Sequence, residues 1–170
     1  SSLKKIIEDH NPVVLLIQEA PVRKGKKFWK DKLFREYNKY YAPMHQVKIQ
    51  NKFYNFSHLG CLILSKYKFN KTKFYELPTV GKNFLGEDHI LKRIVLYVQF
   101  KINEKTFGVY NVHLENMASP RSRKKQIERL LSIIIKNKDD AIIIGGDFNT
   151  FMTNYLETGL RYMERNGYEN

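Results

Sequence analysis

The sequence predicts a single α/β domain, and three observations lead to this prediction. Two unbroken apolar runs of strand length, Val13 to Ile17 and Ala141 to Ile144, have the pattern of strands covered on both faces. Apolar residues recur at helical spacing at the start of the chain and again after Pro120. The 170 residues contain no repeat or linker that marks a boundary, so one domain with a sizeable core is expected.

The first quarter of the chain is expected to hold two helices with a strand between them. Leu3 to Asp9 has helical spacing, and Asn11-Pro12 ends this helix because the residue before a proline disfavours helical geometry. The run Val13 to Ile17 forms the strand. Lys26 to Tyr37 carries four large apolar side chains on or near one side, and we predict a second helix there.

The middle of the chain is predicted to be mostly β. Gly60 to Ser65 and Lys68 to Glu76 are short strand candidates. Ile94 to Phe100 and Thr106 to Val112 are rich in residues that favour strands, and the short link Ile102-Asn103-Glu104-Lys105 joins them. These two runs are therefore predicted to form a hairpin.

A helix with clear start signals follows the hairpin. Ser119 can cap it and Pro120 stands at its first position, where the missing N–H of proline is tolerated. The second apolar run, which ends at Gly145-Gly146-Asp147, comes next. A final helix is predicted from the spacing of Leu156, Leu160 and Met163, with Gly167 at its C-cap.

The chain is strongly basic, with a formal net charge of +13 and a pI near 9.7. Such an excess of Lys and Arg attracts polyanions, either nucleic acid or an anionic membrane. The alternative is a lysine-rich proteome without functional meaning, and the composition alone favours neither.

Cys61 is the only cysteine and lies in an apolar run, so an internal disulfide or a cysteine-based zinc site is excluded and a buried, inert thiol is expected. No apolar run approaches the length of a membrane span. No signal peptide is visible, and together with the single cysteine this favours the cytoplasm. The start at Ser1-Ser2 limits the weight of that expectation.

Two acidic residues follow the apolar strands directly, Glu19 after the first run and Asp147 after the second. The carboxyl ends of strands are where layered α/β proteins bind ligands, and carboxylates there suit a hard cation such as Mg²⁺. Asn149 can reach the same place and could orient a water or a phosphate oxygen. The alternatives are helix caps for the two acids and a turn for Asn149.

His113 ends the predicted strand that begins at Thr106 and stands just ahead of the helix that starts at Pro120. The first turns of that helix carry four cations, which are Arg121, Arg123, Lys124 and Lys125. The helix dipole disfavours cations at this end, and a bound phosphate would compensate for them. The alternative is a solvated face.

Three short motifs in this order resemble the endonuclease/exonuclease/phosphatase superfamily. They are Gln18-Glu19 after an apolar strand, Asn111-Val112-His113-Leu114, and Gly146-Asp147-Phe148-Asn149. The stretch from His113 to Asn116, followed by Ser119-Pro120-Arg121, also resembles a bacterial branch of that group. The matches extend over most of the chain, which is identified as a single, partial domain of this superfamily, residues 1–170.

The resemblance implies a four-layer α/β/β/α sandwich of the deoxyribonuclease I-like type, incomplete in this chain, and a Mg²⁺- or Mn²⁺-dependent phosphoesterase. Glu19 would be the metal ligand, His113 would contact the scissile phosphate, and Asp147 and Asn149 would position the attacking water and the phosphate. The substrate's phosphates are assigned to a further group of residues, which consists of Arg93, Asn116, Arg121 and Arg123.

Two family features are missing from the sequence: a first strand with a metal-binding Asn, and a closing Asp-His motif. We therefore expect a fragment that is inactive by itself. The favoured function is a nuclease acting on DNA or RNA by in-line attack of an activated water. A phospholipid or phosphoinositide hydrolase is the alternative, with residues 82–86 as its candidate membrane loop, and a non-catalytic phosphate-binding module is the third hypothesis. No protein partner is implied.

Overall fold

A computed structural model describes residues 2–23, 26–44, 47–49, 52–54, 59–78, 93–115, 120–149 and 161–168. The elements are α1 (Ser2–His10), β1 (Val14–Arg23), β2 (Lys26–Lys27), the 3₁₀ turns η1 (Phe28–Lys30) and η2 (Lys32–Phe34), β3 (Asn38–Pro43), β4 (Val47–Ile49), β5 (Lys52–Tyr54), β6 (Leu59–Ser65), β7 (Lys71–Glu76), β8 (Ile94–Ile102), β9 (Lys105–His113), α2 (Pro120–Asn137) and β10 (Ala141–Asp147). A short helical segment, residues 161–165, follows.

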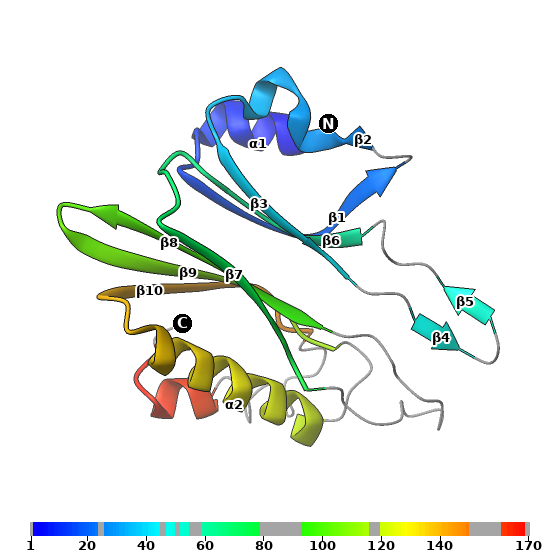
Figure 1. Cartoon of the computed structure of the whole chain (residues 1–170), viewed down its shortest axis with the longest axis vertical. Helices are drawn as coiled ribbons and strands as arrows, with labels where there is room; N and C mark the ends of the chain where they lie inside the picture. The colour runs from blue at the N-terminus through cyan, green and yellow to red at the C-terminus, as the bar shows by residue number, and fades with distance from the viewer. Residues whose placement is uncertain are drawn as a thin grey trace.

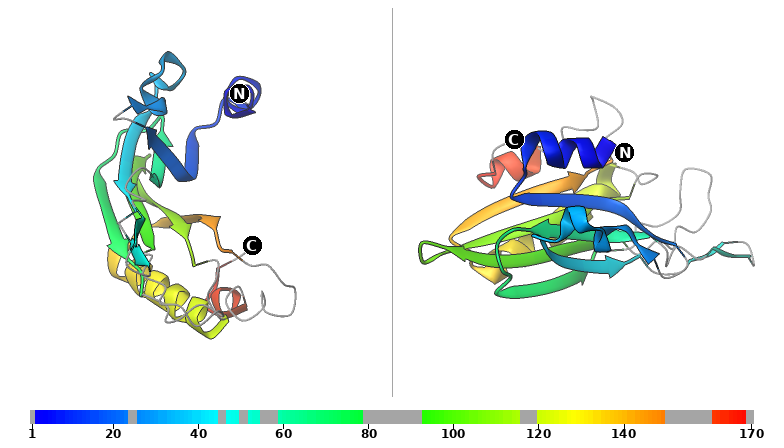
Figure 2. Two further views of the ribbon diagram at one scale, coloured as in Figure 1. Left: turned by 90° about the vertical axis from the view of Figure 1, so that its right-hand side faces the viewer. Right: turned by 90° about the horizontal axis from the view of Figure 1, so that it is seen from above.

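The strands form two four-stranded sheets, in the orders β2-β1-β6-β3 and β10-β9-β8-β7, while β4 and β5 pair with each other. The sheets face each other, with α1 beyond the first and α2 beyond the second (Figure 1; Figure 2 shows the same layers from two other sides). This is the predicted α/β/β/α arrangement. Neither of the two described helices, α1 and α2, is both long and apolar enough to cross a membrane.

Three apolar clusters fill the spaces between the layers. The first lies between α1, the 3₁₀ turns and the first sheet, and includes Ile7, Trp29 and Leu62. The second joins the two sheets through residues such as Ile63 and Leu96. The third packs α2 on the second sheet. Leu62 and Ile63 are both fully buried and lie in different clusters, because successive residues of a strand point to opposite faces of the sheet.

The central hairpin follows the sequence prediction. β8 and β9 pair antiparallel up to the Ile102–Lys105 pair, which leaves Asn103 and Glu104 as the two turn residues. Both have positive φ, 48° and 64°, as a type I′ turn requires. The helix α2 also begins at Pro120 as predicted, whereas its proposed cap Ser119 lies outside the described residues.

The predicted helix from Lys26 to Tyr37 is wrong. These residues form the short strand β2 and two separate 3₁₀ turns. The break is at Asp31, whose backbone is extended (ψ 154°) and whose carboxylate accepts a hydrogen bond from the Leu33 amide at 2.9 Å. Aspartate favours such local caps over a helix interior. The two turns still bury Trp29 and Phe34, so the apolar pattern marked a packed face but not a continuous helix.

The predicted burial of the strand from Ala141 to Ile144 is also wrong. Among the described strands, β10 pairs only with β9 and therefore lies at an edge of its sheet. Ile142 and Ile143 are 38% and 45% exposed. The strand prediction itself is confirmed.

At the end of the chain, Gly167 has a φ of +84°, and its amide donates a hydrogen bond to the Glu164 carbonyl. The Tyr168 amide donates a hydrogen bond to the Met163 carbonyl. That pattern confirms the predicted helix C-cap, whereas Leu156 and Leu160 of the predicted helix lie outside the described residues.

Asp139, just before β10, organises a polar cluster at the end of this strand opposite to Asp147. Its carboxylate accepts hydrogen bonds from the Tyr97 hydroxyl (3.0 Å), the Gln99 amide (2.6 Å) and the Tyr110 hydroxyl (3.0 Å). The cluster holds the connection between α2 and β10 against the second sheet.

Candidate active site

The ends of β9 and β10 bring His113 and Asp147 together. The two strands are parallel, and Asp147 pairs in register with His113. The His113 Nε2 atom lies 3.9 Å from the Asp147 Oδ2 atom. The imidazole is almost fully buried, whereas the Asp147 side chain is 50% exposed. A buried imidazole therefore stands beside a carboxylate that solvent or a ligand can reach.

Asn149 is folded back onto the same strand ends. Its backbone amide donates to the Asp147 Oδ1 atom (2.9 Å), and its side-chain amide donates to the Leu114 carbonyl (2.8 Å). The residue is 7% exposed and has a φ of +50°, which Asn tolerates better than most residues. The turn expected for Asn149 as an alternative is thus present, and this turn holds Asn149 next to Asp147.

Gly146 is required where β10 approaches β9. Its φ is +141°, and an added Cβ would lie 1.9 Å from the Val112 carbonyl oxygen. No side chain fits this space. The glycine that precedes Asp147 in the motif therefore allows the two strand ends to converge at the site.

Glu19 is presented from the first sheet by a β-bulge, and its charge acts on the His113 imidazole. The register between β1 and β6 shifts between Ile17 and Ala20, and Glu19 itself has a φ of +52° and is exposed. Bulges of this kind redirect a side chain and are frequent next to active sites. Because β1 continues to Arg23, Glu19 does not cap a helix, and that alternative is wrong.

Asn111 links the two sheets beneath the site. It is fully buried, and its side-chain amide donates to the Ile17 carbonyl (3.1 Å) and the Leu62 carbonyl (3.0 Å), both in the first sheet. Its Oδ1 atom accepts a hydrogen bond from the Gln18 side chain at 2.5 Å. Asn111 therefore fixes the segment that carries Glu19 relative to β9, which carries His113. The sequence analysis does not predict this role, although a polar residue inside the apolar run of β9 is a usable signal.

Arg93 and Glu115 form a buried ion pair next to His113. The Arg93 Nε and Nη2 atoms lie 3.2 Å and 3.3 Å from the two Glu115 carboxylate oxygens. The Arg93 Nη1 atom lies 3.0 Å and 3.3 Å from the two ring nitrogens of His113. Arg93 was predicted to contact phosphate, and in the structure its side chain is 4% exposed. Glu115 was not singled out, because its partner stands 22 residues earlier in the sequence.

The electrostatic environment keeps His113 neutral. Burial lowers the pKa of its imidazole, and the Arg93 cation lowers this pKa further, against opposing effects from Asp147, Glu19 and Glu115. At neutral pH the ring can therefore donate from one nitrogen and accept at the other. Cys61 is fully buried, as predicted, and burial raises the pKa of its thiol to about 12, which favours the unreactive protonated form.

The cations at the start of α2 are only partly described. The Arg123 Nη1 atom lies 3.5 Å from the Glu115 carbonyl oxygen, and burial lowers the pKa of its guanidinium. Lys124 lies 3.5 Å from the Glu128 carboxylate and 5.1 Å from the centre of the Tyr162 ring. Asn116 and the Arg121 side chain lie outside the described residues. The phosphate contacts assigned to this region stay predictions.

The described residues contain no cluster of three or more His, Cys, Asp or Glu side chains that could hold a metal ion.

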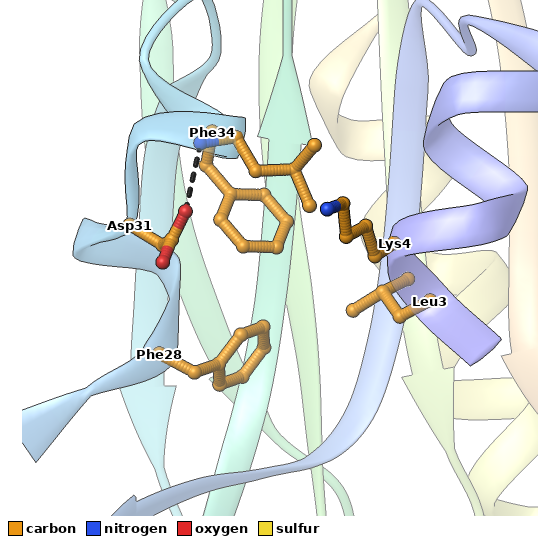
Figure 3. Close-up of a pocket in the computed structure, with 6 residues that line it drawn as sticks. Leu3, Lys4, Phe28, Asp31 and Phe34 are labelled. Carbon is orange, nitrogen blue, oxygen red and sulfur yellow. Dashed lines mark hydrogen bonds between the residues drawn. The ribbon is translucent and has the colours of Figure 1, made fainter. Parts of the chain in front are cut away.

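A pocket of about 300 Å³ lies between α1 and the 3₁₀ turns, and Figure 3 shows six residues that line it. They are Leu3, Lys4, Phe28, Asp31, Leu33 and Phe34. None of them is a predicted site residue.

The sequence profile of the Endonuclease/Exonuclease/phosphatase family matches residues 1–160. The chain belongs to this family. A comparison with curated proteins finds no match.

Solved structures of the same fold are similar to this member of the family. The Bacteroides vulgatus endonuclease/exonuclease/phosphatase is 16% identical, with a TM-score of 0.69 over 99% of this chain and 62% of that one. The human Nocturnin catalytic domain with a bound sulfate anion is 18% identical, with a TM-score of 0.66 over 89% and 56%. D. rerio TDP2 complexed with a single-strand DNA product is 19% identical, with a TM-score of 0.66 over 93% and 56%. The chain thus spans little more than half the length of these structures, and the likeness shows the fold.

Proposed function

We propose that the protein to which this chain belongs is a metal-dependent phosphodiester hydrolase that acts on nucleic acid. The observation that carries the proposal is the convergence of His113, Asp147 and Asn149 at neighbouring strand ends, beside the bulge that presents Glu19. Membership of a family of endonucleases, exonucleases and phosphatases supports phosphoester chemistry.

The residues present fit a Mg²⁺ ion with a single protein ligand. Mg²⁺ is commonly bound through one or two carboxylates, with waters and substrate phosphates as the other ligands. The exposed Glu19 carboxylate meets this requirement, and the protein needs no cluster of three acidic ligands. When bound, such an ion neutralises charge on the phosphate and on the leaving oxygen.

The chain's own groups would orient the reactants. The half-exposed Asp147 carboxylate can accept a proton or a hydrogen bond from an attacking water. The neutral His113 imidazole can donate to a phosphate oxygen, and this interaction strengthens as charge develops in the transition state. Asn149 is held beside Asp147 by its two hydrogen bonds and can contact the same phosphate without adding charge.

One observation favours nucleic acid over lipid as the substrate, and the net charge is compatible with nucleic acid. The net charge of +13 suits a polyanion with many phosphates. One structural neighbour, D. rerio TDP2, holds a single-strand DNA product. The only candidate membrane loop of the lipid alternative, residues 82–86, lies outside the described residues.

The test compares the complete protein with this 170-residue chain on an oligonucleotide that carries a phosphodiester, with Mg²⁺, with Mn²⁺ and with chelator. We expect turnover by the complete protein only with metal, and almost none by the chain alone, which spans 56–62% of its structural neighbours. Metal-independent binding without turnover by the complete protein would support a phosphate-binding module instead.

The substrate class is tested by the salt dependence of binding. Each phosphate neutralised by a cation contributes roughly −0.7 to −0.9 to the slope of log K against log salt. Replacing Arg121, Arg123, Lys124 and Lys125 by Ser should flatten this slope by about two to four units. An unchanged slope, or tighter binding to anionic vesicles than to oligonucleotides at equal salt, would contradict a nuclease.

A further inference from the structure

We propose that Arg93 and Glu115 are a positioning pair that orients the His113 imidazole, and that Arg93 does not bind substrate phosphate. The contacts that support this inference are independent of any reaction. Its consequence for turnover rests on the proposed phosphodiesterase function.

The donors of Arg93 are occupied within the protein. Two of its nitrogens hold the two Glu115 oxygens in a fork, at 3.2 Å and 3.3 Å, the geometry in which a guanidinium and a carboxylate fit best. The third nitrogen, Nη1, lies against His113 and 4.0 Å from the Met44 sulfur. A phosphate could therefore bind Arg93 only in competition with the Glu115 carboxylate and the His113 ring.

Arg93 selects the tautomer of His113. Its Nη1 atom is within hydrogen-bond distance of both ring nitrogens, and a guanidinium can only donate. The contact to Nε2 is the shorter one (3.0 Å, against 3.3 Å to Nδ1), so we infer that Nε2 accepts from Arg93 and that Nδ1 carries the proton of the neutral ring. A single tautomer fixes where His113 donates and where it accepts.

Glu115 is held by Gln126 of the helix α2, which also bonds the segment after β7. Its backbone amide donates to the Gln126 Oε1 atom at 3.1 Å, and the Gln126 side-chain amide donates to the Pro78 carbonyl at 3.1 Å. Gln126 is 1% exposed. A continuous set of contacts thus runs from α2 through Glu115 and Arg93 to His113, so the imidazole is fixed by the packing of the helix on the sheet.

A buried ion pair such as Arg93–Glu115 is expected to add little to the free energy of unfolding. The desolvation of a buried ion pair usually cancels its Coulombic gain, and well-packed apolar replacements are often as stable. Removing only one partner is damaging because it leaves an unpaired buried charge. This contrast allows positioning to be separated from stability by comparing single and double variants.

The experiment uses the complete protein and four variants: Arg93→Met, Glu115→Gln, the double variant Arg93→Met/Glu115→Leu, and Asp139→Asn as a matched control. Asp139 also accepts three hydrogen bonds, at the opposite end of β10. The readouts are the ¹⁵N signals of the His113 ring, assigned with His113→Gln, together with kcat, KM, the urea midpoint and the salt dependence of oligonucleotide binding.

We expect the double variant to unfold at a urea concentration near that of the wild type, yet to show mixed tautomer signals for His113. Its kcat should fall on the order of 10²-fold, the loss typical of a misplaced reacting group, with KM and the salt slope unchanged. Asp139→Asn should keep the wild-type tautomer and kcat.

Two results would overturn the positioning role: a single wild-type tautomer in the double variant, or a wild-type kcat in it. A salt slope that flattens by about one unit in Arg93→Met would instead identify a phosphate contact and would overturn the second half of the proposal. If the wild-type protein shows no turnover, the proposed function fails, and the tautomer signals still decide whether the pair orients His113.

Discussion

Replacing Asn111 by Ala should destabilise the protein far more than the loss of an ordinary surface amide. The substitution removes the donor that serves the Ile17 and Leu62 carbonyls and the acceptor of the Gln18 side chain. Leu62 is fully buried, so its carbonyl would be left unsatisfied at a cost of about 1–3 kcal/mol. The Ile17 carbonyl is partly buried, and its loss adds about 1 kcal/mol. The expected total is about 2–4 kcal/mol, a large fraction of the 5–15 kcal/mol typical of a whole domain.

The matched control is Asn38→Ala. Asn38 also donates to two backbone carbonyls, those of Ser65 and Tyr67, at 3.2 Å and 3.0 Å. It is half-buried, so water can replace its hydrogen bonds and the expected loss is only about 0.5–1 kcal/mol. Both variants are measured by urea unfolding, with the change read from the midpoint at constant slope. Equal losses in the two variants would refute the assignment of Asn111 as the link between the sheets.

Three further predictions concern the site itself. Glu19→Ala should weaken Mg²⁺ binding, measured by titration calorimetry, more than Asn149→Ala does, since only the first removes a charged oxygen ligand; equal losses would make Glu19 a structural residue. His113→Ala should lower kcat on the order of 10²–10³-fold with little change in metal affinity, as for the loss of one transition-state donor; near-normal turnover would remove His113 from the mechanism. The pKa of His113 is lowered in the folded state. As the pH falls below about 6.5, the unfolded chain therefore takes up this proton before the folded chain does. The free energy of unfolding should decrease with decreasing pH until the pH passes the folded-state pKa. Urea midpoints at high and low pH check the sign, and this loss should be smaller in His113→Gln.

Local signals in the sequence predicted the elements that are stabilised locally. The hairpin was predicted because strand-forming runs flank a short polar link, and the turn residues Asn103 and Glu104 accept positive φ. The helix α2 was predicted from Pro120 and its apolar stripe. The prediction of a helix from Lys26 to Tyr37 was wrong because the local cap made by Asp31 outweighs the apolar periodicity. The spacing of apolar residues alone does not reveal that competition.

The site could be predicted in part for a similar reason. His113 and Asp147 end strands, Asn149 follows one, and Glu19 follows the apolar run of β1; these positions in the sequence carry the information. Glu115 was missed because a buried carboxylate is recognised only by its partner, and that partner, Arg93, stands before β8, far from Glu115 in the sequence. The same holds for Asn111, whose partners lie in the opposite sheet. Contacts between distant segments depend on tertiary packing, which a single sequence does not display.

The two edges of the second sheet differ in their protection against pairing with other chains. β7 exposes Lys71 and Lys73 along its length, and lysines on an edge strand repel an incoming strand. β10 carries no charge between Ala141 and Gly146 and exposes Ile142 and Ile143. Of the two described edges of the second sheet, β10 is therefore the one open to intermolecular strand addition. At high protein concentration, chains should associate through this edge, and this association should limit solubility despite the strong repulsion expected from the net charge.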